Sequence, residues 1–311
     1  MGWWTEVTEG SWKAEPARRG RSNSVFQYFS IRKCSVVGWS PTRWRGRPLL
    51  ASVREMARSE DVERAAAMVA AASRIVVLTG AGISTDSGIP DFRGPNGVWT
   101  KNPAAEKMAT LQHYVAEPDV RRAAWQNRLH SPTWSAQPNS GHRALADFER
   151  SGRLAALITQ NVDGLHQSAG SDPTRVIEIH GTMREVVCLS CEERAPMARA
   201  LARVEAGEED PDCRSCGGIL KSATISFGQS LVGADLDRAD RAARSCDLLV
   251  AVGTTLAVYP VAEVVPVAKR HGAAVVIING EATAMDHLAD VVLLASIGEV
   301  LPTVLGVTPP E

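Results

Sequence analysis

The 311-residue sequence predicts an α/β fold, a doubly wound parallel sheet with a small zinc-binding domain inserted into it. Six short runs of Val, Ile and Leu are continuous instead of alternating with polar residues, which is typical of strands that helices bury on both faces. Helix-like stretches lie between several of these runs. Four of the six cysteines form two Cys-x-x-Cys pairs, a spacing that indicates a metal site and not a disulfide framework.

The individual elements follow from local patterns along the chain. The first helix is expected to begin at Ser59, an N-cap that acidic residues follow, and to end at Ala72. Further helices are expected over residues 141–150 and 259–271. The predicted strands cover residues 74–80, 154–159, 176–179, 248–252, 273–278 and 291–294. Because ligands of doubly wound sheets bind at the carboxyl ends of the strands, the functional residues are expected there.

The composition excludes several classes of protein. With 44% hydrophobic and 22% charged residues, the chain resembles a soluble globular protein and not a disordered or fibrous one. No apolar run reaches the roughly 18 residues that span a bilayer, so no contact with a membrane is expected. The chain opens without a signal peptide and its cysteines follow metal spacing, so a reducing, cytoplasmic location is expected.

Residues 1–55 differ in composition from the rest of the chain. The first 50 residues carry nine Lys and Arg against three Asp and Glu, a net charge of +6. Since the whole chain has a net charge of −1, the remaining residues carry −7. The segment lacks sustained periodicity, so we expect a disordered extension or a true start at Met56. A transit peptide and a basic arm for nucleic acid are the alternatives.

The end of the first strand has the features of a binding loop. It reads Gly80-Ala-Gly-Ile-Ser and continues into Pro90-Asp-Phe-Arg93. Glycines let the backbone approach a pyrophosphate, and free N–H groups at a helix start favour its charge. Gly80-x-Gly82 alone could be a plain strand-to-helix turn, because Thr85 stands where the dinucleotide fingerprint has its third glycine. The carboxylate, aromatic ring and guanidinium of residues 91–93 favour the binding loop.

Two more strand ends carry polar side chains. Gln160, Asn161 and Asp163 follow the second strand, where they could bind a ribose or a carboxamide, or could form an Asx-type turn that caps the next helix. His180 follows the third strand, and its unperturbed pKa near neutrality suits a general base. A lone histidine at such a position is otherwise more often structural.

The metal candidates are four cysteines with 21 residues between the two pairs. Four thiolates match a closed tetrahedral zinc site, which has no position for a substrate, so the zinc is expected to be structural. A redox Cys-x-x-Cys is the alternative, but it usually needs one pair and not two. Cys34 and Cys246 have no partner pattern. The four expected ligands are Cys188, Cys191, Cys213 and Cys216.

Taken together, these motifs resemble those of the sirtuin family, of the bacterial type. Gly-Ala-Gly-Ile-Ser, Gly-Ile-Pro-Asp-Phe-Arg, Gln-Asn-x-Asp-x-Leu-His and a His-Gly before the cysteine pairs occur in the family's order over residues 57–302. The resemblance implies a catalytic domain over residues 56–305, preceded by the extension 1–55. Its Rossmann-like large domain would cover about 56–90, 140–187 and 222–305, and its small domain about 91–139 plus the zinc module 188–221.

The resemblance implies an enzyme that removes acyl groups, acetyl first of all, from protein lysine and consumes NAD, producing nicotinamide and O-acyl-ADP-ribose. The acyl oxygen would attack the nicotinamide ribose, and His180 would then take a proton from a ribose hydroxyl so that it attacks the resulting alkylimidate. Asn161 would position ribose and water. Asp163 and Asp91 would serve the nicotinamide end, and Phe92 would shield the intermediate.

The resemblance also distributes the binding residues. An extended acyl-lysine peptide would add its backbone between two segments, at Phe227 and Gly228 and at Leu256 and Val258. Protein substrates are thus the expected partners, and no nucleic acid is expected. The residues implied for NAD are Gly80, Ala81, Gly82, Ser84, Asp91, Phe92, Arg93, Gln160, Asn161, Asp163, Gly253, Thr254, Thr255, Asn279, Gly280 and Glu281.

The chain departs from the family pattern where substrate choice is decided. Gln229 replaces the usual Glu, and residues 220–225 lack the usual Pro, while Thr255 replaces a common Ser and keeps its hydroxyl. Family members that remove dicarboxylic acyl groups carry Tyr-x-x-Arg, and this chain has Trp125-Gln-Asn-Arg128 with Arg122 nearby. Arg128 could bind a carboxylate, or it could be a surface arginine beside a packed tryptophan. The acyl group therefore stays open.

Other classes of function remain as alternatives. An NAD-consuming ADP-ribosyltransferase would need the glycine loop and Asn161 but no peptide groove. A deacylase for longer or dicarboxylic acyl groups would share the whole site. A zinc-ribbon module that binds nucleic acid through the Arg-rich residues 17–47 would leave residues 160–163 and His180 without a role.

Overall fold

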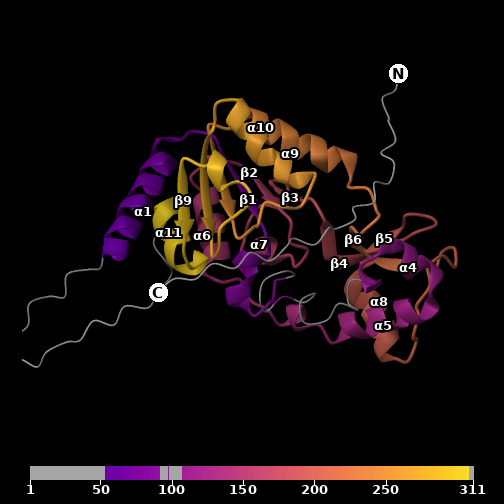
Figure 1. Cartoon of the computed structure of the whole chain (residues 1–311). Coiled ribbons are helices and arrows are strands. Elements are labelled where there is room, and N and C mark those ends of the chain that lie inside the picture. The colour runs from indigo at the N-terminus through magenta and orange to yellow at the C-terminus, as the bar shows by residue number, and fades with distance from the viewer. Residues whose placement is uncertain (1–52, 92–96, 98–106, 308–311) are drawn as a thin grey trace, which may run out of the picture. The chain divides into compact units, whose positions relative to one another are not determined.

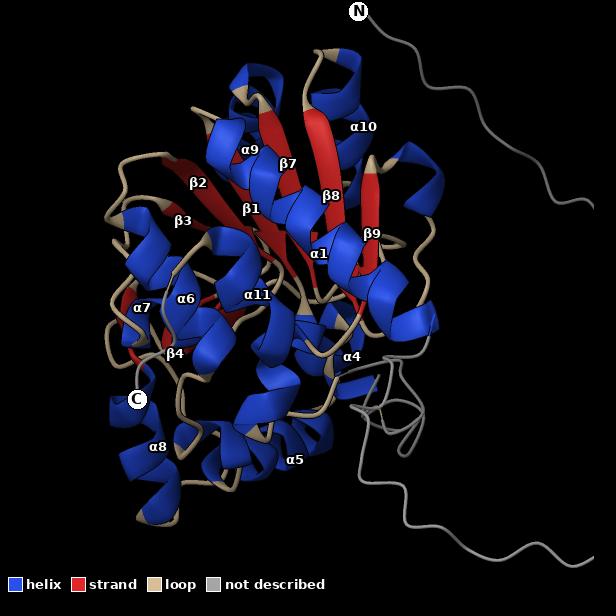
Figure 2. Cartoon of the chain, turned by 90° about the vertical axis from the view of Figure 1, so that its left-hand side faces the viewer, coloured by secondary structure: helices blue, strands red, loops and turns tan. Residues whose placement is uncertain are grey.

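The central sheet of the computed structural model contains six parallel strands in the order β3-β2-β1-β7-β8-β9 (Figure 2). The structure describes residues 53–91, 97 and 107–307, which belong to one compact unit, Leu50–Glu311. Each apolar run predicted as a strand is one of these strands, with ends that differ by no more than one residue. Their bounds are Ile75–Thr79 (β1), Leu154–Thr159 (β2), Val176–Glu178 (β3), Leu248–Val252 (β7), Ala274–Asn279 (β8) and Val291–Leu294 (β9). The predictions for residues 1–52, with Cys34, lie outside the described residues.

Helices cover both faces of the sheet, which confirms the doubly wound fold. Successive residues of β1 point to opposite sides, so Ile75 and Val77 lie in one apolar core while Val76 and Leu78 lie in the other. The first core is covered by α1 (Val53–Ala71), α6 (Ser140–Glu149) and α11 (Ile297–Leu305), and the second by α9 (Gly233–Ser245) and α10 (Val264–Arg270), on opposite sides of the sheet in Figure 1.

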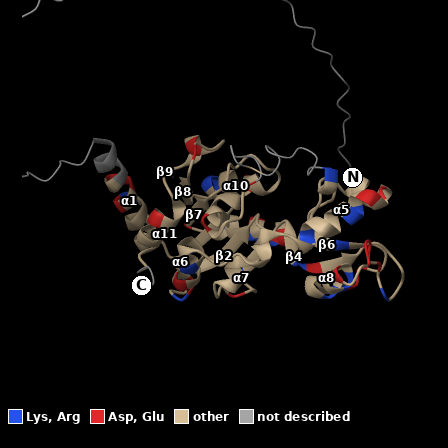
Figure 3. Cartoon of the chain, turned by 90° about the horizontal axis from the view of Figure 1, so that it is seen from below, with Lys and Arg blue, Asp and Glu red and all other residues tan. Residues whose placement is uncertain are grey.

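Charged residues lie outside this core. Five of the six strands contain none, and Glu178 at the end of β3 is the exception. Figure 3 shows Lys, Arg, Asp and Glu mainly on the helices and loops around the sheet. Among the described residues, no helix combines the length and apolarity that crossing a membrane requires.

Two predicted helix boundaries are wrong. The first helix begins at Val53 and not at Ser59, because the intervening residues Arg54 to Arg58 are good helix formers that extend it upstream of the expected cap. The helix expected over 259–271 is a short 3-10 turn, η3 (Val261–Glu263), followed by α10. Both begin after Pro260, whose ring restricts the residue before it to extended conformations.

A second, three-stranded antiparallel sheet carries the cysteine pairs. It contains β5 (Arg194–Pro196), β4 (Gly181–Cys188) and β6 (Leu220–Thr224) in that order. It has its own core, centred on Trp125, Val186 and Met197. The accompanying helices are α4 (Leu111–Ala116), α5 (Pro118–Leu129) and α8 (Met197–Glu205). Since β4 begins at the residue after His180, the two sheets meet where the sequence places the reaction.

The remaining short elements are η2 (Pro132–Trp134), η4 (Asp286–Leu288), η1 (Ala81–Ser87) and α7 (Leu165–Ser168). Of these, η1 and α7 follow β1 and β2 at the carboxyl edge of the large sheet. Two loops touch there through glycines. Gly82 N–H donates to Gly253 O over 2.8 Å, and an added Cβ on Gly82 would lie 2.8 Å from Gly253 Cα. Gly253 has a φ of +63°, and a Cβ there would lie 2.4 Å from Ile83 N. No larger residue fits either position without moving backbone.

Gly253→Ala should lower the free energy of unfolding by about 2–4 kcal/mol, since the new methyl group meets backbone at a left-handed position. Urea unfolding with a fluorescence readout would measure the change. The matched control is Gly233→Ala in α9, where an added Cβ meets no atom within 4 Å. Equal stability of the two variants would contradict the role given to the loop contact.

Candidate functional site

Buried polar side chains form a network at the carboxyl ends of β1 and β2. The Asn161 amide donates to Gly80 O over 3.1 Å and to Ser84 Oγ over 3.0 Å. Ser84 Oγ donates in turn to Asp163 Oδ2 over 2.8 Å. The side chains of Ser84, Asn161 and Asp163 are at most 7% exposed, and these hydrogen bonds hold them in place. Four residues that the sequence selected for NAD thus lie in direct contact.

Two histidines outside the sequence predictions adjoin this network. His142 Nδ1 lies 3.0 Å from Asn139 Oδ1, which also caps α6 and can only accept, so Nδ1 carries the proton. The unprotonated Nε2 then lies 3.4 Å from Ser84 Oγ. His166 Nε2 lies 3.0 Å from Thr79 Oγ1. Burial lowers the pKa of His142 to about 4 and the pKa of His166 well below its ordinary value, so both rings are neutral at pH 7.

Of these two histidines, only His166 had a signal in the sequence, as the last residue of Gln-Asn-x-Asp-x-Leu-His. His142 stands in an ordinary amphipathic helix, 58 residues from the serine it meets. No pattern in the sequence links the two positions.

His180 is held in one tautomer beside this network. Its Nδ1 lies 3.0 Å from the carbonyl oxygen of Gln160, and since a carbonyl only accepts, Nδ1 bears the proton and Nε2 is left as the basic nitrogen. Gln160 is itself fixed, because its amide donates to Thr254 Oγ1 over 2.8 Å. Burial lowers the pKa of His180, outweighing the opposing effect of the hydrogen bond that Nδ1–H donates to the Gln160 backbone carbonyl. The imidazole is therefore neutral at pH 7 and able to accept a proton.

Only part of the predicted peptide site lies at the surface. Phe227 is 40% exposed, Gly228 is exposed and Val258 is half-buried. Leu256 is 1% exposed, packs in the second apolar core and donates its N–H to Thr254 Oγ1 over 3.2 Å. The Phe227 backbone already bonds the chain, since its N–H donates to Ala109 O and its carbonyl accepts from Leu111, each over 2.9 Å. Gln229, which stands where the family usually has Glu, closes its own turn, because its Oε1 accepts the Ser226 N–H over 3.2 Å. An added strand would therefore meet Gly228 more freely than Phe227 or Leu256, and the Val258 carbonyl already accepts the Ala262 N–H over 3.0 Å.

The remaining residues predicted for NAD are spread along the same edge. Asn279 ends β8, is buried, and donates through its amide to Glu281 O over 2.7 Å, while Gly280 and Glu281 are exposed. Thr255 is exposed and Ala81 half-buried. Asp91 ends the described part of the first loop, and Phe92 and Arg93 lie outside the described residues.

The four predicted cysteines converge. Their sulfur atoms all lie within 4.8 Å of one another. Cys188 Sγ is 3.5 Å from Cys216 Sγ, and Cys191 Sγ is 3.7 Å from Cys213 Sγ. A tetrahedron of thiolates at the usual zinc–sulfur bond length places its sulfurs about 3.8 Å apart. The cluster therefore fits a zinc ion, and with four protein ligands it leaves no position for a substrate. The cysteines are the only such group of possible ligands found among the described residues.

Trp125 and Arg128 pack together in the small domain. Trp125 is fully buried, and its Nε1 has no hydrogen-bond partner among the described residues. The Arg128 guanidinium lies over the rings of Trp125 and Tyr114, and its Nη1 is also buried and unpartnered there. Lys221 of β6, which the sequence did not single out, is 1% exposed. Burial and the nearby Arg128 lower the pKa of Lys221 to about 7. Two unpaired donors and two basic side chains thus gather at one place.

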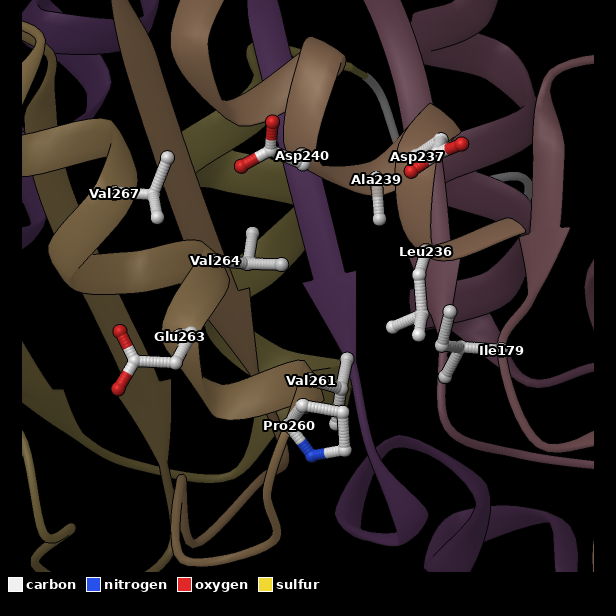
Figure 4. Close-up of a pocket in the computed structure, with 10 residues that line it drawn as sticks. All are labelled: Ile179, Leu236, Asp237, Ala239, Asp240, Pro260, Val261, Glu263, Val264 and Val267. Atoms are coloured by element: carbon white, nitrogen blue, oxygen red, sulfur yellow. The ribbon is translucent and has the colours of Figure 1, made fainter. Parts of the chain in front are cut away.

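A separate cavity of about 230 Å³ lies between α9 and the η3–α10 segment (Figure 4). It borders the site only through Ile179, which precedes His180, and none of the predicted site residues lines it. Figure 4 shows its lining: Ile179, Leu236, Asp237, Ala239, Asp240, Pro260, Val261, Glu263, Val264 and Val267.

Fold and site together define a doubly wound α/β protein with an inserted four-cysteine module. The chain belongs to the Sir2 family, whose model matches residues 80–260. It is 50% identical over 231 residues to the "NAD-dependent protein deacetylase 2" of Streptomyces coelicolor, covering 74% of this chain and 96% of that protein.

Solved Sir2 structures agree with this membership. One, described as "Structural Basis for the Mechanism and Regulation of Sir2 Enzymes", is 39% identical with a TM-score of 0.72, over 80% of this chain and 97% of that chain. Another, a Sir2 protein with a p53 peptide and NAD+, is 32% identical with a TM-score of 0.69, over 77% and 95%. The family resemblance found in the sequence is thereby confirmed.

Cys188→Ser should remove one thiolate from the tetrahedral set, abolish tight zinc binding and unfold the small sheet. Zinc content after gel filtration and thermal unfolding would measure both effects. Ser190→Ala, between the cysteines of the same pair, offers a matched control that keeps all four ligands. A Cys188→Ser protein with one zinc per chain and an unchanged melting temperature would rule out a structural metal at this cluster.

Proposed function

We propose that the chain removes acyl groups, acetyl first of all, from lysine side chains of proteins and consumes NAD, with nicotinamide and O-acyl-ADP-ribose as products. The observation that carries the proposal is His180, whose basic Nε2 is fixed by the Nδ1–Gln160 bond beside the buried Ser84–Asn161–Asp163 network. An acyl transfer that ends on a ribose hydroxyl needs such a base. The relative from Streptomyces coelicolor carries the same activity in its name.

NAD, when bound, supplies the electrophilic ribose carbon that accepts the acyl oxygen. His180 takes the proton of a ribose hydroxyl at Nε2, and its depressed pKa keeps the ring neutral and ready at pH 7. Gln160 holds the ring through its carbonyl and is itself held by Thr254. The positive charge that develops on His180 is therefore stabilised by the Gln160 backbone carbonyl, which is already in place, so the site does not need to rearrange.

The buried network orients the ribose end of NAD. Asn161 and Ser84 offer polar atoms to the ribose and to a bound water, and the Asp163 carboxylate, with Asp91, serves the nicotinamide end. The glycine loops at residues 80–82 and 253–255 let the phosphates come close to the backbone, while the N–H groups of Gly80, Gly82 and Gly253 donate to carbonyl oxygens of the chain itself. Residues 279–281 hold the adenosine side, and Phe92 and Arg93 complete the first loop. These assignments follow the sequence predictions for the residues at the carboxyl ends of the strands.

The zinc ion holds the small domain in shape and takes part in no step. We include in the proposal that residues 56–305 form the catalytic domain and that the protein acts in the cytoplasm, where the four thiolates stay reduced. The partners are acylated proteins, whose backbone adds to the segments around Gly228 and residues 256–258. Residues 51–311 carry a net charge of −7, so this part of the chain should repel the negatively charged phosphates of nucleic acid.

An acyl group that ends in a carboxylate is the second candidate. The unpartnered donors at Trp125 Nε1 and Arg128 Nη1 favour it, because a buried donor without an acceptor is unfavourable and a carboxylate would satisfy both. The acetyl group of acetyl-lysine ends in a methyl group and offers no carboxylate. The two candidates differ in the acyl group alone and share every other residue of the site.

The proposed function is tested by incubating the protein with NAD and a panel of acyl-lysine peptides, and identifying the products by mass spectrometry. O-acyl-ADP-ribose should form, and His180→Tyr should reduce its formation by about a thousandfold or more, since the base is lost. Zinc content and the melting temperature should stay unchanged. His130→Tyr, an exposed histidine in the small domain, serves as the control. ADP-ribosylated protein without deacylated peptide would instead establish the transferase.

Arg128→Met should decide between the acyl groups. If a carboxylate binds there, hydrolysis of succinyl-lysine peptide should fall by about tenfold or more while acetyl-lysine is processed as before. The matched control is Arg122→Met on the same helix, because Arg122 pairs with Asp119 at the surface. A wild-type protein that processes acetyl-lysine and leaves succinyl-lysine untouched would eliminate the second candidate.

A further inference from the structure

The polar network closes into a ring that passes through His166. Thr79 Oγ1 donates to Thr159 Oγ1 over 2.8 Å, and Thr159 Oγ1 also accepts the backbone N–H of Asn161 over 3.1 Å. His166 Nε2 lies 3.0 Å from Thr79 Oγ1. On the other side, Asp163 Oδ1 accepts the N–H of Leu165, the residue before His166, over 2.9 Å. The ring thus joins the ends of β1 and β2 to helix α7.

The proton of the neutral His166 ring sits on Nε2. His166 is 1% exposed, and its Nδ1 has no hydrogen-bond partner among the described residues. A buried N–H without an acceptor is rarer and less favourable than a buried acceptor without a donor. Nδ1 is therefore the unprotonated nitrogen, and Nε2 donates to Thr79 Oγ1. Burial of the ring, and to a lesser extent the His142 ring 4.9 Å away, lower the pKa of His166 and keep a second proton off.

This tautomer gives the hydroxyl chain a direction. Because Thr79 Oγ1 receives the His166 proton, its own proton points to Thr159 Oγ1, in agreement with the 2.8 Å contact. With its position fixed in this way, Thr159 Oγ1 remains an acceptor for the Asn161 N–H. Without the imidazole, the Thr79 hydroxyl could turn, and Thr159 could donate to it and move away from Asn161.

We propose that His166 is a positioning residue of the deacylation reaction, which through Thr79 and Thr159 holds Asn161 where its amide can serve the ribose. The inference rests on the proposed function, since it assigns a role in that reaction. His166 is buried and reaches the site only through the two threonines, so it acts on the geometry of Asn161 and not on the substrate. The peptide segments lie on other elements and are not part of the ring.

His166→Leu should lower kcat for deacylation by about tenfold, the effect of losing one buried hydrogen bond. KM for the peptide should stay within about twofold, because the groove is untouched. His166→Gln should restore most of kcat, since its amide N–H can donate to Thr79 as the imidazole does. A role in folding alone would predict no such dependence on a donor.

Ser171→Ala is the matched control. Ser171 lies just after α7, its N–H donates to His166 O over 3.1 Å, and its buried Oγ has no partner among the described residues. Removing this hydroxyl changes the same neighbourhood without touching the ring, so kcat should stay at the wild-type value. Melting temperature and zinc content of all variants report on folding.

Thr159→Val adds a test of the pathway. It removes the acceptor of the Asn161 N–H, so it should lower kcat like His166→Leu, and the double variant should be no slower than the slower single variant. Wild-type kcat in His166→Leu, no rescue by Gln, or losses that multiply in the double variant would each overturn the inference. An inactive wild-type protein would overturn the proposed function and the inference with it.

Discussion

The close contact of two glycine loops at the centre of the sheet is the constraint on which the site depends. β1 pairs with β2 on one side and β7 on the other, so the chain leaves β1 at the point where the strand order reverses. The loops after β1 and β7 touch there, with Gly80 and Gly82 against Gly253. The three glycines let the loops come close enough for the Gln160 side-chain amide to donate to Thr254. The backbone carbonyl of Gln160 in turn orients His180. The glycines that the sequence assigned to a pyrophosphate also serve the packing of the protein itself.

Beneath this edge the protein keeps two histidines neutral. A protonated imidazole beside Asp163 would cancel its charge, and burial prevents this by lowering the pKa of His142 and His166. The Asp163 carboxylate, which accepts from Ser84 and Leu165, therefore has neutral rings and not imidazolium ions as neighbours. The low dielectric of such a site makes each fixed dipole more effective than it would be in water.

Both sheets position His180. It follows the last residues of β3 in the large sheet and immediately precedes β4 of the small one. Its carbonyl accepts the Ile225 N–H over 2.7 Å, which ties it to the segment after β6. The cysteine cluster lies at the far end of β4 and β6, where Cys188 pairs with Leu220. A zinc ion at that end would stabilise the strand pair whose other end adjoins His180.

The sequence by itself determined the layered sheet. Strands that are buried on both faces are apolar along their length, so they form continuous apolar runs that can be recognised without knowing which strands pair. The sequence also determined the cysteine set and the polar residues at strand ends, since their spacing is local. It misplaced the start of the first helix, where Ser59 as a cap competed with helix formers upstream. Only the tertiary structure decided that His142 meets Ser84 and that His166 meets Thr79, 87 residues away in the chain. It alone placed Lys221 beside Arg128. Contacts of this kind depend on the order of the strands, which no local pattern encodes.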